Sequence, residues 1–226
     1  MSVDLGAWTS LVGTSEDSVN CWAVLLARWS EQHRRYHGIG HLSAMLRFLD
    51  GYADHAADSH AVRLAAWYHD AVYDPRSTDN EERSAVLAED ELGALGLPAD
   101  RVKEVSRLVR LTAGHDPAEG DRNGELLNDA DLMVLASPPE AYAAYLNAIR
   151  QEYAHVPDAD FRTGRAAVVE GLLAAPRLYR MESLATMEDA ARRNLSAELS
   201  LLRPHPDAAE ADEDQRAAGP PAPPGP

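Results

Sequence analysis

The sequence is short of several residue types, and each shortage excludes a class of protein. Cysteine occurs once, at Cys21, which rules out an intrachain disulfide. Lysine occurs once, at Lys103, and the formal net charge is −16, so the clustered basic residues that bind a polymeric nucleic acid are missing. No apolar run approaches the roughly 18 residues of a membrane span, and the N-terminus has no basic, signal-like start. We therefore expect a cytoplasmic protein that binds neither a nucleic-acid polymer nor a membrane.

The remaining composition favours closely packed helices. Apolar residues make up 45% of the 226 residues, and Ala and Leu are abundant while Phe occurs only twice. Apolar residues recur at helical spacing in nine segments, and no segment alternates with the period of a strand. We predict an all-α fold, a compact bundle of about eight or nine helices. The predicted helices cover roughly residues 15–33, 42–52, 59–70, 79–92, 98–112, 126–135, 137–149, 157–174 and 182–202.

The composition changes near residue 203. An acidic cluster between Asp207 and Asp214 is followed by a Pro-rich end, and such a stretch cannot bury a core. We therefore predict one helical domain over residues 1–202 and a disordered tail over residues 203–226.

A histidine and an aspartate, His69 and Asp70, end the apolar helical run 61–68. The pair is weak evidence alone, since His115-Asp116 repeats it within a polar loop. A buried carboxylate needs a partner, which a divalent cation or an arginine would supply.

Other candidate ligands lie on neighbouring predicted helices. His37 and His41 would share one helix face if that helix begins by Tyr36; the alternative is two partly exposed histidines at a helix start. Asp129 and Asp131 lie in an apolar helix and point roughly 200° apart. One of the two should face inward, and their spacing alone does not decide which.

Along the chain the candidates come in the order His41, then His69-Asp70, then Asp131. This ordered series resembles the ligands of the metal-dependent HD phosphohydrolase superfamily. The surrounding motifs are similar to those of a bacterial subgroup of predicted phosphohydrolases, over about residues 20–180. These motifs are Tyr36-His37-x-x-x-His41-Leu42, Trp67-Tyr68-His69-Asp70-x-Val72-Tyr73, Asp79-Asn80-Glu81-x-x-Ser84, Ala130-Asp131-Leu132, Tyr142-x-x-Tyr145, Ile149-Arg150-x-Glu152-Tyr153 and Phe161-x-x-Gly164-Arg165.

The resemblance implies that His41, His69, Asp70 and Asp131 bind one divalent metal ion. Asp131 is favoured over Asp129 because the family's last aspartate commonly follows a small residue. A mixed imidazole and carboxylate set suits Mn²⁺, Fe²⁺, Co²⁺ or Zn²⁺ better than Mg²⁺.

Three further residues would decide the chemistry. His37 matches a histidine that some members place beside the leaving group, which implies a general acid. His115 lies where dinuclear members keep an extra histidine, and Glu81 could bridge two ions or hold a water. Their ordinary alternatives are a loop histidine near helix carbonyls and a first-turn helix acid. One or two ions per site are therefore expected, with Asp70 also helping to orient the attacking water.

Phosphate recognition requires cations, and the candidates are Arg34, Arg35, Arg150 and Arg165. The alternative is structural pairing, for which Arg150 has Glu152 nearby and Arg165 has Glu170. Tyr36, Trp67, Tyr68 and Tyr73 could line a base-stacking wall, although aromatic residues at helical spacing are usually core.

We therefore expect a metal-dependent phosphohydrolase that cleaves a phosphoester of a nucleotide or another small phosphorylated metabolite with metal-activated water. Two other classes stay open. One is a di-iron HD-type oxygenase, and the other is a non-catalytic HD module that binds a nucleotide. The sequence also leaves room for a homodimer.

Overall fold

The computed structural model describes residues 3–203, and all of the regular structure in that range is helical. No strand occurs between residues 3 and 203, so the predicted all-α class is confirmed. Three short 3₁₀ helices are η1 (Ala53–His55), η2 (Met133–Ala136) and η3 (Glu182–Leu184). The α-helices are α1 (Leu5–Val12), α2 (Glu16–Trp29), α3 (Ile39–Gly51), α4 (Ser59–Tyr68), α5 (Asn80–Ala94), α6 (Ala99–Leu111), α7 (Arg122–Leu132), α8 (Pro139–Glu152), α9 (Asp158–Ala174) and α10 (Ala185–Leu202).

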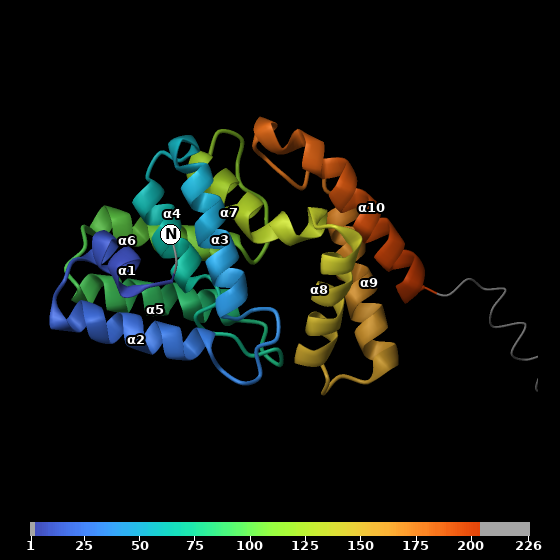
Figure 1. Ribbon diagram of the computed structural model, residues 1–226, viewed down its shortest axis with the longest axis horizontal. Coiled ribbons are helices and arrows are strands. Elements are labelled where there is room, and N and C mark those ends of the chain that lie inside the picture. The colour runs from blue at the N-terminus through green and yellow to red at the C-terminus, as the bar shows by residue number, and fades with distance from the viewer. Residues whose placement is uncertain (1–2, 204–226) are drawn as a thin grey trace, which may run out of the picture.

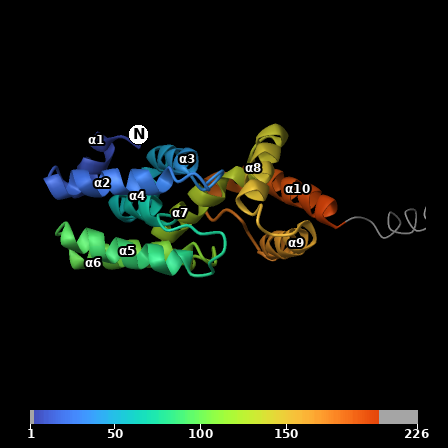
Figure 2. The same ribbon diagram turned by 90° about the horizontal axis from the view of Figure 1, so that it is seen from below.

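The helices form two groups, α1–α7 and α8–α10, which η2 connects (Figure 1). The view from below shows the same division (Figure 2). Within the first group, α4 packs against α3, α5, α6 and α7. Seven of its ten residues are buried, and three of them are alanines, whose small side chains let neighbouring helices approach closely. The end of α4, where His69 follows, is therefore surrounded by other helices.

The start of the chain differs from the prediction. Helix α1 was not predicted; Asp4 caps it by accepting a hydrogen bond from the backbone N–H of Ala7 at 2.8 Å. The helix is held by Trp8, which is fully buried with its ring 5.4 Å from that of Trp67. With α1 included, the described residues contain ten α-helices instead of eight or nine.

Several helix boundaries also differ. Ser15 caps α2 as predicted, but α2 ends at Trp29 rather than near His33. The N-cap of α4 is Asp58, where Ser59 was expected. Helix α3 begins at Ile39, so His37 lies in the preceding turn and the predicted shared helix face with His41 is wrong.

The predicted tail lies outside the described residues, apart from Arg203, and the domain boundary at residue 202 stays a prediction. Among residues 3–203, no helix is both long and apolar enough to cross a membrane.

Candidate metal centre

The first part of the site is His69, the residue that ends α4. Its side chain is 2% exposed, and Nδ1 lies 2.9 Å from the carbonyl oxygen of Ala66. Because a carbonyl only accepts, Nδ1 carries the proton and Nε2 of the neutral ring presents its lone pair. The Trp29 ring packs 5.4 Å from the His69 ring, and its indole N–H donates to the carbonyl of Trp67. The orientation of His69 is therefore set from two sides.

Three more side chains converge on this nitrogen. Nε2 of His41 lies 3.2 Å from Nε2 of His69 and 3.1 Å from Oδ1 of Asp131. Oδ2 of Asp70 lies 3.2 Å from Nε2 of His69. Ligand atoms of His41, His69 and Asp131 all lie within 4.8 Å of one another, so these three residues form a group that could hold a metal ion.

The donor set fits a divalent cation. Ligand bonds of about 2.0–2.2 Å place neighbouring ligand atoms roughly 3–3.5 Å apart, and the shortest distances in the cluster are of that size. Two imidazole nitrogens that face each other at 3.2 Å need a proton or a cation between them, because two lone pairs repel. The nearby carboxylates of Asp70 and Asp131 favour a positive charge at this point.

The pKa values in the cluster reflect this charge balance. Burial would lower the pKa of His69, but the charges of Asp70 and Asp131 raise it to about 9. Burial would raise the pKa of Asp70, but the positive charge on His69 lowers it to about 2. For Asp131 the effect of burial is likewise outweighed by His69 and His41, so its pKa lies well below its ordinary value. The carboxylates are thus ionised, and the proton on His69 balances part of their charge. A divalent cation bound here would take the place of that proton and would leave the ring neutral, with the Nε2 lone pair free to bind it.

The two aspartates of α7 have different partners. Asp131 faces the histidines, whereas Asp129 is fully buried and accepts hydrogen bonds from the backbone N–H groups of Arg180 at 2.7 Å and Met181 at 2.8 Å. Asn128 donates a third hydrogen bond to Asp129 at 3.0 Å. Asp129 therefore attaches the segment before α10 to α7, and Asp131 is the aspartate at the candidate metal centre.

His37 is held by a residue that the sequence did not single out, Glu152. One oxygen of Glu152 accepts hydrogen bonds from the backbone N–H groups of Arg35, Tyr36 and His37 at 2.7–2.9 Å. The other oxygen lies 2.7 Å from Nδ1 of His37 and 2.8 Å from the hydroxyl of Tyr73. The Glu152 side chain is fully buried. His37 lies before the start of α3, so its position is fixed by these contacts with Glu152 and not by a helix of its own.

A sequence signal for Glu152 does exist. Tyr142, Tyr145 and Ile149 mark the inward face of α8, and Glu152 continues it at spacings of three, four and three residues. A carboxylate on the buried face of a helix needs strong partners. A pairing of Glu152 with Arg150 was the structural alternative expected for that arginine, but the guanidinium of Arg150 contacts Asp158 at 2.5 Å.

His115 approaches the cluster from the loop after α6. Its Nε2 lies 3.7 Å from Oδ2 of Asp131, and its Nδ1 is buried without a hydrogen-bond partner. Its φ of 50° lies in the left-handed region, which no other non-glycine residue adopts between residues 3 and 203. Backbone strain of this kind often accompanies functional positions.

Glu81 is positioned by its neighbours in the sequence, Asn80 and Ser84. The side chain of Asn80 accepts from the backbone N–H of Asp74 and donates to its carbonyl, at 3.0 and 2.9 Å. Ser84 accepts from the backbone N–H of Val72 at 3.0 Å. Asn80 and Ser84 thus fasten the loop after Asp70 to α5, and this contact brings Glu81 into the wall of the pocket.

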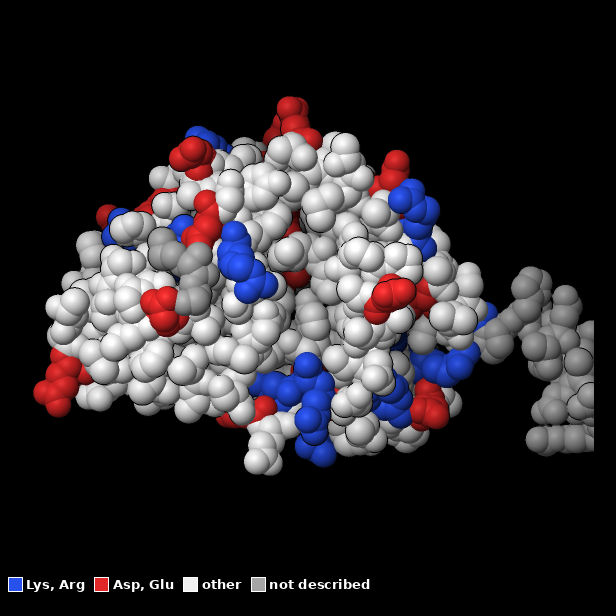
Figure 3. All heavy atoms as spheres, viewed as in Figure 1, with Lys and Arg blue, Asp and Glu red and all other residues white. Residues whose placement is uncertain are grey.

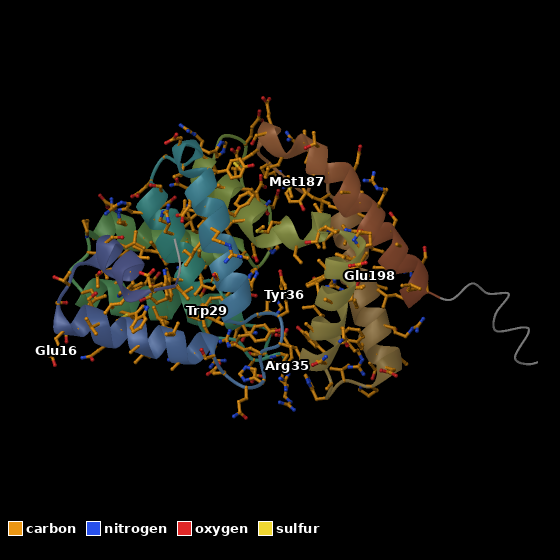
Figure 4. The ribbon with its side chains drawn as sticks, viewed as in Figure 1. Glu16, Trp29, Arg35, Tyr36, Met187 and Glu198 are labelled. Atoms are coloured by element: carbon orange, nitrogen blue, oxygen red, sulfur yellow. The ribbon has the colours of Figure 1, made fainter. Side chains whose placement is uncertain are left out.

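These residues surround a cavity of about 400 Å³, here called the metal pocket, between the two groups of helices. Figure 3 shows a recess on this face where the groups meet. Tyr36 projects into the space between them, whereas Trp29 lies within the first group (Figure 4). His37, His69, Asp70, Glu81, His115 and Asp131 all line the metal pocket. Tyr36 and Tyr73 line it too, but Trp67 and Tyr68 belong to the core.

Of the four arginines predicted to bind substrate, only Arg165 lines the metal pocket. Its Nε lies 2.6 Å from Glu198, and it donates to the hydroxyl of Tyr145 at 3.0 Å. The expected partner Glu170 instead pairs with Arg203.

The other three arginines, Arg34, Arg35 and Arg150, do not line the metal pocket. The buried guanidinium of Arg34 donates to the carbonyls of His37, Asp70 and Ala71 at 3.0, 2.7 and 3.2 Å. Arg35 lines a separate depression beside Tyr73. The substrate-binding roles of these arginines stay predictions.

Comparisons with models of protein families, with curated proteins and with solved structures found no match to this chain. The family resemblance therefore rests on the sequence motifs.

Proposed function

We propose that this protein is a metal-dependent phosphohydrolase of the HD superfamily, which cleaves a phosphoester of a nucleotide or another small phosphorylated metabolite. The observation that supports the proposal is the cluster of His41, His69, Asp70 and Asp131, with distances of 3.1–3.8 Å between neighbouring ligand atoms. Three of the four, His69, Asp70 and Asp131, line the metal pocket. The volume of about 400 Å³ is within the roughly 300–1,000 Å³ of small-molecule sites.

A divalent cation held by these four residues would lower the pKa of a water molecule and polarise a phosphoryl oxygen. The chain supplies the rest of the arrangement. Asp70 has one oxygen near His69, and its second oxygen can accept a hydrogen bond from the attacking water. Glu81 lines the same pocket and can hold a second water.

His37 is suited to protonate the leaving group. Its Nδ1 is bound to Glu152, and Nε2 has no hydrogen-bond partner among residues 3–203. Its side chain lines the metal pocket and is 23% exposed. In the proposed reaction, the water oxygen forms a bond to phosphorus while the bond from phosphorus to the ester oxygen breaks. The ester oxygen takes a proton from Nε2 of His37 and leaves as an alcohol. The attacking water gives up one proton to solvent, and His37 takes one back from solvent, so the net reaction consumes one water.

The proposal is tested by metal analysis and turnover together. Protein purified without added metal is analysed for bound elements, and hydrolysis of p-nitrophenyl phosphate and a panel of nucleotides is assayed with Mn²⁺, Fe²⁺, Co²⁺, Zn²⁺ and Mg²⁺. We expect hydrolysis that depends on a divalent ion and is lost in Asp131→Ala. Undiminished activity in that variant would sink the proposed site.

One observation favours a second candidate, a di-iron oxygenase. His115 lies near the outer oxygen of Asp131, and Glu81 lines the same pocket, so ligands for a second ion are available. Two irons per chain with oxygen uptake, and no phosphate release, would select this function. Bound metal without either activity would select a non-catalytic module.

A further inference from the structure

A second cavity lies between α8 and α9, directly beside the metal pocket. It has a volume of about 470 Å³, and we call it the α8–α9 pocket. Five residues line both cavities, so the two adjoin: His37, Tyr145, Tyr153, Arg165 and Val168. Figure 1 shows α8 and α9 in the second group of helices. A molecule at the metal pocket that reaches past these shared residues would enter the α8–α9 pocket.

The wall that is unique to the α8–α9 pocket is largely apolar. Ile149, Val156 and Phe161 contribute aliphatic and aromatic surface, and Gly164 leaves space where another residue would place a side chain. The ring of Phe161 lies 6.1 Å from that of Tyr153. Such a surface binds groups that lose little by leaving water.

The charges around the two cavities disfavour an additional anion. Among their lining residues, Arg165 is the only Lys or Arg. Its side chain is 11% exposed and is neutralised by Glu198, which is 4% exposed. The remaining charged residue of the α8–α9 pocket is Asp160, an exposed acid. A di- or triphosphate chain would thus lack the free cations that such groups require.

His37 lines both cavities, and its proposed role as general acid indicates which part of the substrate lies in each. In the proposed hydrolysis, the ester oxygen leaves at His37, so phosphorus lies on the side of the metal ligands. The alcohol portion would then lie away from the metal ligands, and His37 also lines the α8–α9 pocket.

We propose that the α8–α9 pocket binds the uncharged, apolar alcohol portion of a phosphate monoester, aromatic or branched aliphatic. Such esters are then preferred over nucleoside di- and triphosphates. This inference rests on the proposed function for the phosphoryl end, while binding of the alcohol itself does not require metal or turnover.

Gly164 provides a matched test. A Cβ placed on Gly164 meets no atom within 4 Å, and the same is true of Gly171 in the same helix. Gly164 lines the α8–α9 pocket, whereas Gly171 lines neither cavity. A Cβ at Gly164 has room, so Gly164→Leu should place its side chain in the α8–α9 pocket, and Gly171→Leu should leave that pocket open.

Binding of 2-naphthol to the metal-free full-length protein is measured by fluorescence anisotropy. Wild type and Gly171→Leu should bind equally, and Gly164→Leu should bind at least about tenfold more weakly. Phe161→Ala, which removes one aromatic wall, should also weaken binding and serves if Gly164→Leu does not fold. No binding by wild type, or equal binding by every variant, would overturn the proposal.

A kinetic comparison separates this inference from the proposed function. With Mn²⁺, kcat/KM for 2-naphthyl phosphate should exceed that for ATP and ADP, and Gly164→Leu should reduce it. If 2-naphthol binds as expected but no phosphoester is hydrolysed, the phosphohydrolase proposal fails and the apolar pocket stands. A higher kcat/KM for ATP would overturn the proposed substrate class.

Discussion

Oε2 of Glu152 lies 2.7 Å from Nδ1 of His37, a contact between residues 115 positions apart in the chain. Since a carboxylate only accepts, the proton must lie on Nδ1, and Nε2 is the atom left for chemistry. Glu152 also accepts three backbone N–H groups, which fixes the turn that carries His37. The position of His37 therefore depends on α8 and not on its own helix.

Replacement of Glu152 by Gln should disturb this turn. The neutral amide loses the charge-assisted hydrogen bonds, so we expect a loss of about 1–3 kcal/mol in the free energy of unfolding. Bound metal should be retained because Glu152 contacts none of the four candidate ligands, while kcat for a phosphoester should fall. Urea unfolding, metal analysis and kcat are the measurements.

Tyr73→Phe is the control for Glu152→Gln. It removes the hydrogen bond that the Tyr73 hydroxyl donates to Oε2 of Glu152, the oxygen that also contacts His37. The free energy of unfolding should therefore fall by about 0.5–1.5 kcal/mol. Equal effects of the two variants on kcat would contradict a specific role for Glu152 in positioning His37.

Glu152 should also make stability sensitive to acid. Burial would raise its pKa, but the hydrogen bond and charge of His37 and the backbone N–H groups lower it from 4.5 to about 2. A carboxyl whose pKa is depressed in the folded state stabilises the fold above its unfolded pKa. This contribution is therefore lost as the pH falls from about 4.5 towards about 2. His37 is protonated in both states over this range and does not alter the slope.

The free energy of unfolding, measured at a series of pH values below 5, should decline more steeply for wild type than for Glu152→Gln. Chelator present throughout removes any contribution from bound metal. Parallel declines for the two proteins would show that another carboxyl dominates.

Asp129 and Asp131 allow a paired test of the candidate metal centre. Asp129→Ala leaves two backbone donors and one amide donor unsatisfied in the core, so it should destabilise the fold by at least about 3 kcal/mol. Asp131→Ala should destabilise the metal-free protein far less and should abolish metal binding. Thermal melts with and without Mn²⁺, together with calorimetric titration, distinguish the two. Retention of metal by Asp131→Ala would contradict the assignment.

Arg34 should behave as a positioning residue. Its guanidinium holds the carbonyls of His37, Asp70 and Ala71 together, and a lysine cannot reach all three. Arg34→Lys should cost about 2–3 kcal/mol of stability and should weaken metal binding about 10–100-fold, as loss of an outer-shell contact does. Arg35 is the exposed neighbour of Arg34, and the control variant Arg35→Lys should change neither the stability nor the metal affinity. Normal stability with a raised KM in Arg34→Lys would instead favour the predicted substrate contact.

Much of the candidate site was accessible from the sequence because its residues interrupt apolar helices. His41, His69 and Asp131 are polar residues in largely apolar segments, and their order along the chain resembles that of the ligands in the HD superfamily. The choice between Asp129 and Asp131 was harder, because both face other parts of the protein: Asp129 is fully buried, and Asp131 is 15% exposed at the metal pocket. Which face meets the histidines depends on residues 180 and 181, which return to α7 after 50 residues of intervening chain.

The arrangement around His37 could not be predicted from local pattern. Helical spacing suggested that His37 shares a helix face with His41. However, Gly38 is the N-cap and α3 begins only at Ile39, so His37 lies outside the helix. The contact that holds His37 is tertiary and spans 115 residues. The partners of Arg150 and Arg165 were likewise set by packing rather than by sequence proximity.

The positions of these residues along the chain have a consequence for biosynthesis. All four candidate ligands lie between residues 41 and 131, whereas Glu152, Arg165 and Glu198 follow later. Synthesis proceeds from the N-terminus, and domains begin to fold in that order. A growing polypeptide therefore contains the complete candidate ion-binding cluster before the ribosome has made the glutamate that orients His37.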